Sequence, residues 1–200
     1  EVIVSDEDVY TLAMYTTAMQ HGIPCTFSGG IPIDYTLTGQ AARLYLAWID
    51  SGYHLEPILQ ALKQGILRPH TAEAVTTGSL IRILEKSGIG WGRERYELLW
   101  RMPAPSPAAD ATASETDLDA TPAVRLADWF HHIFAVLPAR DEEWTPSAVM
   151  KGFEILLESI PVRDDNEAQA QAGLRHLAET LRCAEIETMD RAMAVRYIRE

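Results

Sequence analysis

The residues best suited to take part in chemistry are five basic side chains near the middle of the chain, Arg82, Lys86, Arg93, Arg95 and Arg101. Arginine and lysine bind phosphate oxygens, so this cluster is typical of a contact with a nucleic-acid backbone or with an acidic partner. Three glutamates interrupt the cluster, and ion pairs within and between helices are the other use of the same charges. The sequence leaves both interpretations open.

Glycine-rich turns are the second candidate for ligand binding. The chain has no glycine-rich loop that ends in Lys-Ser or Lys-Thr, which excludes a nucleotide site of the P-loop type. The turn Ser28-Gly29-Gly30 follows an expected strand, as a dinucleotide-binding loop would, but a third glycine is missing and Pro32 removes a backbone N–H. We therefore interpret Gly29 and Gly30, together with Gly22, as structural turn residues and predict no cofactor.

The histidines and acidic residues form no pattern typical of a catalytic or metal site. His131 and His132 are adjacent on an expected helix, so their side chains point in different directions. Asp164 and Asp165 would supply half of a divalent-metal site, but the lysine that a nuclease needs does not follow them in a strand. We predict no catalytic residue and no metal ligand in this chain.

The composition limits which classes of protein are possible. Of the 200 residues 47% are hydrophobic, which is enough for a core, and the formal net charge is −12. Residues 103–200 carry 9 Lys and Arg against 18 Asp and Glu, so the chain is a poor stand-alone nucleic-acid binder, although a local basic face remains compatible with this charge. Two distant cysteines fit free thiols in the cytoplasm. No apolar run approaches the roughly 20 residues of a membrane span, so we expect no membrane contact.

The first thirty residues read as a β-α-β unit. Val2-Ile3-Val4 predicts a strand, a helix follows as far as Gln20, and residues 23–28 predict a second strand after the helix ends at Gly22. Because the chain begins directly with an expected strand and without a methionine, we interpret it as a piece of a longer protein. The predicted fold class is mainly α, with this small β-α-β unit at the N-terminus.

The rest of the chain has helical periodicity. Residues 103–122 are the exception, because they are rich in Pro, Ala and acidic residues and predict a flexible acidic insertion. We expect two domains, 1–35 and 36–200, the second being a helical bundle. Its expected helices cover 39–50, 55–64, 71–87, 92–101, 123–137, 145–160 and 167–199, the last being one helix or two joined near Ala184.

The order of motifs around the glycine turn resembles a known family. His21-Gly22-Ile23-Pro24, then Phe27-Ser28-Gly29-Gly30 and a buried helix, is similar to UvrD/Rep-type superfamily I helicases where domain 2A passes into domain 2B. The stretch from Gly88 to Tyr96 resembles more specifically the AddB branch, the second subunit of bacterial helicase–nucleases, an inactivated helicase with a nuclease domain. The resemblance covers about residues 1–101. Active helicases carry an aromatic-rich segment after the two glycines, where this chain has Ile31-Pro32-Ile33-Asp34-Tyr35.

This resemblance implies a role without catalysis for these residues. The chain would be a 2A-like remnant followed by a helical 2B-like domain. It would contact DNA and a partner subunit of an ATP-dependent helicase/exonuclease that acts in double-strand-break repair and recombination. The motifs for ATP binding and for the nuclease belong to other parts of such a protein, so no catalytic residue is carried over. An all-α protein-interaction module with no nucleic-acid role is the alternative, and a small α/β enzyme that uses the glycine turn is a third hypothesis.

Overall fold

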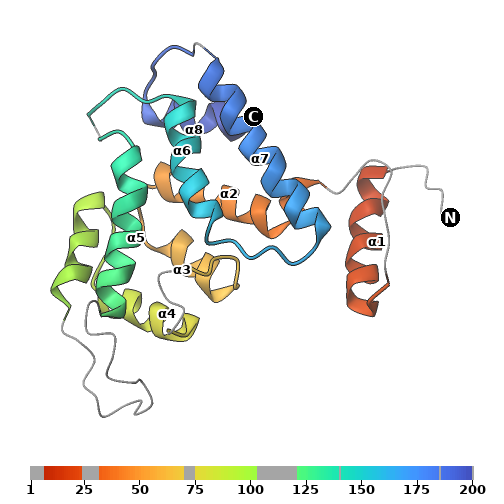
Figure 1. Cartoon of the computed structure of the whole chain (residues 1–200), viewed down its shortest axis with the longest axis horizontal. Coiled ribbons are helices and arrows are strands. Elements are labelled where there is room, and N and C mark those ends of the chain that lie inside the picture. The colour runs from red at the N-terminus through yellow and green to blue at the C-terminus, as the bar shows by residue number, and fades with distance from the viewer. Residues whose placement is uncertain are drawn as a thin grey trace.

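The protein is described here by a computed structural model that covers residues 7–23, 32–69, 75–102, 121–139, 141–184 and 186–199. The described part is built from helices that surround a central one (Figure 1). In chain order the elements are α1 (Glu7–His21), the 3-10 helix η1 (Ile33–Tyr35), α2 (Leu37–Asp50), α3 (Glu56–Lys63), α4 (Thr77–Lys86), the 3-10 helix η3 (Arg93–Arg101), α5 (Pro122–Val136), α6 (Pro146–Leu157), α7 (Asp165–Cys183) and α8 (Arg191–Arg199).

The predicted β-α-β unit is wrong, whereas the mainly α class is confirmed. The described residues form no sheet, and their β pairing is a single antiparallel bridge between Trp144 and Met189. Ile23, expected to open the second strand, instead donates its N–H to Ala18 O at 2.9 Å after Gly22 has turned to φ +63°. This is the hydrogen bond of a helix C-cap, so the residue ends α1. The remaining residues of the two predicted strands, 2–4 and 24–28, lie outside the described residues.

Helix α2 is the centre of the fold. Its sequence is apolar nearly all round, which predicts a buried helix, and Tyr45, Trp48 and Ile49 are each at most 1% exposed. α2 packs against α3, α6, α7 and α8 (Figure 1). The Trp48 ring lies between 5.0 and 6.1 Å, centroid to centroid, from five other aromatic rings. These five are Tyr45, Tyr53, Tyr96, Phe130 and Phe134.

Residues 121–199 share one core with residues 36–101. The buried Tyr45 hydroxyl donates to Val149 O of α6 at 2.9 Å. The carboxylate of Glu167, which is 5% exposed, accepts hydrogen bonds at the start of α2 from the N–H groups of Leu37 and Thr38 and from the Thr38 hydroxyl. A carboxylate is stabilised at a helix N-terminus because unpaired N–H groups point towards it. The N-terminus of α7 is thereby fixed to that of α2.

Local capping explains where several helices begin. The side chains of Thr36, Thr76, Thr121, Thr145 and Asp164 each accept a hydrogen bond from the backbone N–H three residues later. The start predicted at Thr145-Pro146 is confirmed. Of the two alternatives left open for 167–199, the structure shows two helices, with α7 ending at Cys183 and α8 beginning at Arg191. The segment 92–101 is helical but has 3-10 geometry. Most of the predicted acidic insertion, residues 103–120, lies outside the described residues.

Helix α1 differs from the others in its surroundings. Figure 1 shows it beside the bundle instead of inside it. Its side chains Tyr10 and Met14 are 48% and 36% exposed. Among the helices that the structure describes, none is both long and apolar enough to cross a membrane.

Candidate functional site

Four of the five basic side chains predicted as contacts lie at the surface. Arg82 and Lys86 are on α4, and Arg95 and Arg101 are on η3; all four are exposed. None of them has an ion-pair partner among the described residues. Both elements pack near α5 (Figure 1), and we call these four residues the basic edge. Intra-helical pairing, the alternative use expected for these charges, therefore does not occupy them in the described part of the chain.

Arg93 has a different environment from the other four. Its guanidinium donates to the carbonyl oxygens of Phe134 and Leu137, the latter at 3.2 Å, and lies 5.1 Å from the centre of the Phe134 ring. The last carbonyls of a helix have no partner inside the helix and carry partial negative charge. Arg93 therefore caps the C-terminus of α5 and holds η3 against it. It is half-buried and less available to a ligand than the basic edge.

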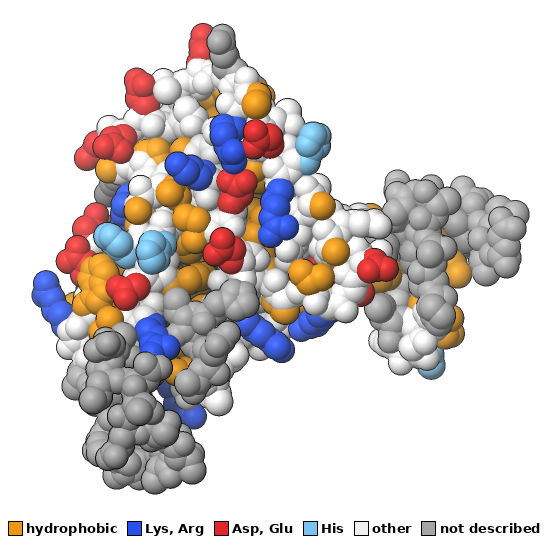
Figure 2. Space-filling model, in the orientation of Figure 1, with side chains coloured by type: hydrophobic (Ala, Val, Ile, Leu, Met, Phe, Trp, Pro, Cys, Tyr) orange, Lys and Arg blue, Asp and Glu red, His pale blue; other side chains and the backbone are white. Residues whose placement is uncertain are grey.

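Figure 2 shows how charge is distributed over one face of the molecule. Acidic and basic side chains are mixed across most of it. Along part of the lower edge in this view, Lys and Arg side chains are seen without a neighbouring Asp or Glu. Lys63 of α3 forms a 2.9 Å ion pair with Glu85 of α4, and both side chains are about half exposed. The chain as a whole is acidic, so any attraction for an anion arises from such local groups.

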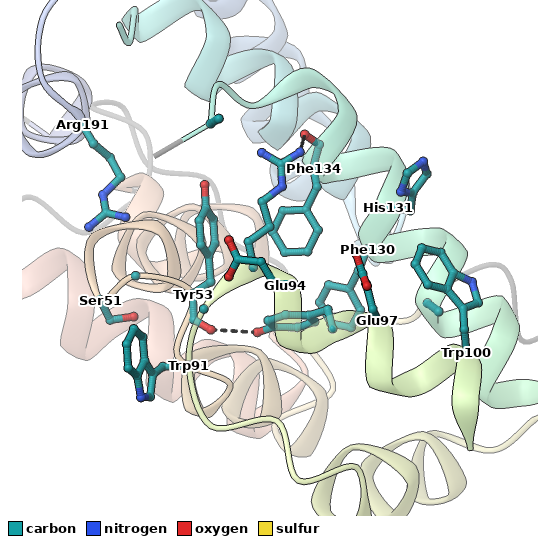
Figure 3. A pocket seen from close by; sticks show the side chains of 16 residues that line it. Ser51, Tyr53, Trp91, Glu94, Glu97, Trp100, Phe130, His131, Phe134 and Arg191 are labelled. Carbon is teal, nitrogen blue, oxygen red and sulfur yellow. Dashed lines mark hydrogen bonds between the residues drawn. The ribbon is translucent and has the colours of Figure 1, made fainter. Parts of the chain in front are cut away.

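A pocket of about 530 Å³ opens beside η3 (Figure 3). Two loops fix its rim: Leu55 N–H donates to Gly90 O at 3.2 Å, and Gly92 N–H donates to Gly52 O at 3.0 Å. The first residue of α8, Arg191, reaches it from the far side. Its wall contains aromatic, basic and acidic groups, and we name it the Tyr53 pocket. Among its lining residues are Tyr53, Trp91, Glu94, Glu97, His131 and Arg191.

Two buried tyrosines form the floor of this pocket. The Tyr96 hydroxyl accepts a hydrogen bond from Trp48 Nε1 at 2.7 Å and donates to Tyr53 O at 3.1 Å, the contact dashed in Figure 3. Burial raises the pKa of Tyr53 from 10.0 to about 12; Arg93 and Arg191 oppose this shift, and the negative charge of Glu94 adds to it. Burial also raises the pKa of Tyr96, although the hydrogen bond from Trp48 acts against it. Both hydroxyls are therefore protonated donors at neutral pH.

Tyr53 is unusual in two further respects. Its φ is +65°, in the left-handed region that favours glycine, and such strained residues cluster at functional sites. Its side chain is only 5% exposed, and its hydroxyl has no hydrogen-bond partner among the residues that the structure describes. A buried polar group without a partner costs free energy, so a ligand that accepts this hydrogen bond would be favoured.

Several acidic side chains make structural hydrogen bonds, and the two adjacent histidines lie at the surface. Asp164 caps α7, Glu142 accepts from Ala139 N–H at 2.7 Å, and Glu143 accepts from the Thr188 hydroxyl at 2.7 Å. His131 and His132 are exposed on α5, and the His131 ring lies 5.6 Å from that of Trp100. In the described ranges, no group of three or more His, Cys, Asp or Glu side chains is arranged to hold a metal ion.

The sequence named the four residues of the basic edge, whose role as contacts stays a prediction, and did not predict the Tyr53 pocket. Of the predicted turn residues, Gly22 has the expected positive φ, whereas Gly29 and Gly30 lie outside the described residues. Tyr53 and Arg191 are far apart in sequence, so no local motif joins them. The one local sign was the turn Ser51-Gly52-Tyr53, which breaks a helix and places a large residue directly after its glycine.

No protein-family model, no curated protein and no solved structure gives a significant match to the chain.

Proposed function

We propose that the chain is a non-catalytic helical module of a bacterial, cytoplasmic helicase–nuclease of the AddB type, and that it contacts DNA through the basic edge. The parent protein would be an ATP-dependent helicase/exonuclease subunit that processes double-strand breaks for repair and recombination. The order of motifs in residues 1–101 supports the choice of family. The helical 2B-like part of the proposal agrees with the mainly α fold.

The basic edge is the observation that carries the DNA contact. Its four cations are exposed and have no ion-pair partner in the described part of the chain. Trp91 and Trp100, which are 61% and 40% exposed, lie on the same stretch as Arg95 and Arg101. Cations that track a phosphate backbone and aromatic faces on which bases stack are the usual components of a single-strand contact. A tailed duplex presents both a phosphate backbone and unpaired bases to this surface.

The test is a binding titration of a fluorescent tailed duplex with the isolated chain at about 50 mM salt, where phosphate contacts are strong. Substitution of all four basic-edge residues by Gln is expected to weaken binding at least about 10-fold and to reduce the salt slope by about 3 to 4, since each phosphate contact contributes about 0.9. A charge-matched control replaces four exposed cations elsewhere by Gln and should bind almost normally. These are Arg43, Lys151, Arg163 and Arg196.

Two results would refute the DNA contact. One is undetectable binding of the wild-type chain at this salt concentration. The other is an equal loss of affinity in the two four-residue variants, because binding would then follow net charge and not the basic edge.

A protein-interaction role has a separate observation in its favour. Met193 and Tyr197 of α8 are 55% and 52% exposed and, four residues apart, lie on one face of the helix. This face would contact the partner subunit. Replacing both residues by Ser should abolish binding to the partner subunit without changing affinity for DNA. An unchanged affinity for the subunit would remove this candidate.

A further inference from the structure

Two hydrogen-bond donors in the Tyr53 pocket lack an acceptor among the described residues. The Tyr53 hydroxyl is buried and unpartnered. The guanidinium of Arg191 has neither a hydrogen bond nor an ion pair with the described part of the chain. Its two terminal nitrogens lie 4.0 Å from the place that a Cβ on Gly52 would occupy, so they face the turn that carries Tyr53. A guanidinium and a hydroxyl that share a pocket are best satisfied by an anionic oxygen.

The remaining wall offers two other kinds of contact. Trp91 is 61% exposed and presents an indole at the rim next to Ser51 (Figure 3). Glu94 and Glu97 supply carboxylate oxygens, which accept hydrogen bonds from N–H groups. A volume of about 530 Å³ lies in the usual range for small-molecule sites. The ligand that fits all these groups has an anionic end, a flat ring and an amine.

We propose that the Tyr53 pocket binds one nucleotide of a single nucleic-acid strand, with its phosphate at Arg191 and Tyr53 and its base against Trp91. A nucleotide with an exocyclic amine has all three features, whereas a peptide carboxylate lacks the flat ring. The inference rests on the proposed function, because that function brings a DNA strand to η3. It assigns a single bound nucleotide to a pocket that the four cations of the basic edge do not line.

The pocket is held in shape before any ligand arrives. The Tyr53 carbonyl accepts from Tyr96, and the Tyr53 N–H donates to Trp48 O at 2.8 Å, so both sides of this strained residue are fixed by the aromatic core. The rim loops are joined by the two hydrogen bonds from Leu55 and Gly92. A fixed site loses little conformational entropy on binding. Weak ligands such as mononucleotides therefore suffice as probes.

The experiment is isothermal titration of the isolated chain with dAMP, deoxyadenosine and inorganic phosphate. We expect dAMP to bind at least about 10-fold more tightly than either part alone, because phosphate and base occupy different groups. Arg191→Gln should lower the affinity for dAMP at least about 10-fold, and Tyr53→Phe should lower it about 3- to 10-fold. Arg196→Gln, on an exposed position of the same helix, is the matched control and should leave the affinity unchanged.

Tyr53→Phe separates a ligand contact from a structural role. Because the hydroxyl has no partner in the described part of the fold, its removal should leave the thermal midpoint unchanged or higher while it weakens dAMP. The assignment is overturned if dAMP does not bind at millimolar concentration, if Arg191→Gln and Tyr53→Phe bind it as the wild type does, or if an acidic peptide binds more tightly.

The basic-edge variant distinguishes this proposal from the proposed function. This variant should lose its affinity for the tailed duplex and keep its affinity for dAMP, since none of the four substituted residues lines the pocket. Loss of dAMP binding in that variant would overturn the pocket assignment. Failure of the wild type to bind duplex, with dAMP still bound, would overturn the DNA contact and retain the nucleotide site.

Discussion

The contact between Gly152 of α6 and Tyr45 of α2 allows a quantitative test of the core. Tyr45 is 1% exposed, and its hydroxyl reaches Val149 O one turn before Gly152. A Cβ built on Gly152 would lie 2.3 Å from the Tyr45 hydroxyl oxygen and 3.0 Å from Leu137 Cδ2. Carbon and oxygen atoms do not approach to 2.3 Å without a bond. The substitution Gly152→Ala must therefore displace the Tyr45 ring.

Three contributions set the size of the effect. Overpacking of a close-packed core costs about 1 to 3 kcal/mol. Displacing Tyr45 also breaks its hydrogen bond and leaves a buried hydroxyl unpaired, at about 1 to 3 kcal/mol. Alanine gains about 1 kcal/mol over glycine in a helix interior. We expect Gly152→Ala to lower the free energy of unfolding by about 2 to 4 kcal/mol.

A double-mutant cycle shows whether the hydroxyl is the obstacle. Tyr45→Phe alone should cost about 1 kcal/mol, the net value of a typical hydrogen bond. In the Tyr45→Phe background the atom closest to the new Cβ is absent. Gly152→Ala should therefore lower the free energy of unfolding by at least about 1 kcal/mol less than it does in the wild type. The measurement is urea unfolding followed by far-ultraviolet circular dichroism, with equal m-values across the cycle.

Gly173→Ala is the matched control for this cycle. Gly173 lies in the interior of α7, and a Cβ there would meet no atom within 4 Å. This variant should be more stable than the wild type by about 0.5 to 1 kcal/mol. The packing argument is refuted if Gly152→Ala is as stable as the wild type, or if its cost and that of Tyr45→Phe are simply additive.

Three further perturbations test other parts of the structure. Glu167→Ala leaves the backbone N–H groups at the start of α2 without their carboxylate, and urea unfolding should show a loss of about 2 to 4 kcal/mol. Arg93→Gln removes the charged cap of α5 and should cost about 1 to 2 kcal/mol in the same assay. Burial raises the pKa of Tyr53 to about 12 in the folded protein, from 10.0 in the unfolded chain. The folded state therefore gains stability from this proton, fully below pH 10, and loses that gain as the pH rises through about 12. Across that window the free energy of unfolding should fall by about 2 kcal/mol less in Tyr53→Phe than in the wild type.

Each of these predictions has its own control and its own contrary result. Glu179→Ala, at an exposed position of α7, should change stability by less than about 0.5 kcal/mol. An equally small effect of Glu167→Ala would contradict the view that its hydrogen bonds to the start of α2 stabilise the fold. Arg95→Gln should be similarly mild; if it is as costly as Arg93→Gln, capping is not the reason. For Tyr53, parallel pH profiles of the variant and the wild type would show that its hydroxyl does not titrate with unfolding.

The sequence predicted those features that depend on neighbouring residues. Thr145 followed by Pro146 starts a helix because the threonine side chain caps the first turn and proline already has a helical φ. The burial of residues 39–50 followed from their composition, and the break near Ala184 was one of two alternatives that helical periodicity allowed. Gly22 ended α1 as expected, since only its lack of a Cβ permits the left-handed turn without cost.

The errors lie where distant parts of the chain decide the outcome. Isoleucine favours strands, but a strand forms only where a second strand pairs with it. Ile23 follows the C-terminus of α1, and its N–H donates to Ala18 O, a carbonyl that would otherwise lack a partner. Arg93 looked like one more cation in a cluster, and only the fold brings it to the end of α5, more than forty residues away. Glu167 and Thr38 are 129 residues apart, so their contact has no trace in local spacing.

The Tyr53 pocket follows from the same core that holds the bundle together. Trp48, the most central aromatic residue of α2, binds Tyr96 through its indole N–H, and Tyr96 in turn fixes the Tyr53 carbonyl. The floor of the pocket is therefore held by the core, while Trp91 at the rim is exposed to a base. Arg93 joins the two regions, because it fixes η3 to the end of α5 beside the Phe134 ring. A substitution that loosens the core at Trp48, which does not line the pocket, would thus weaken the binding of a ligand that Trp48 does not contact.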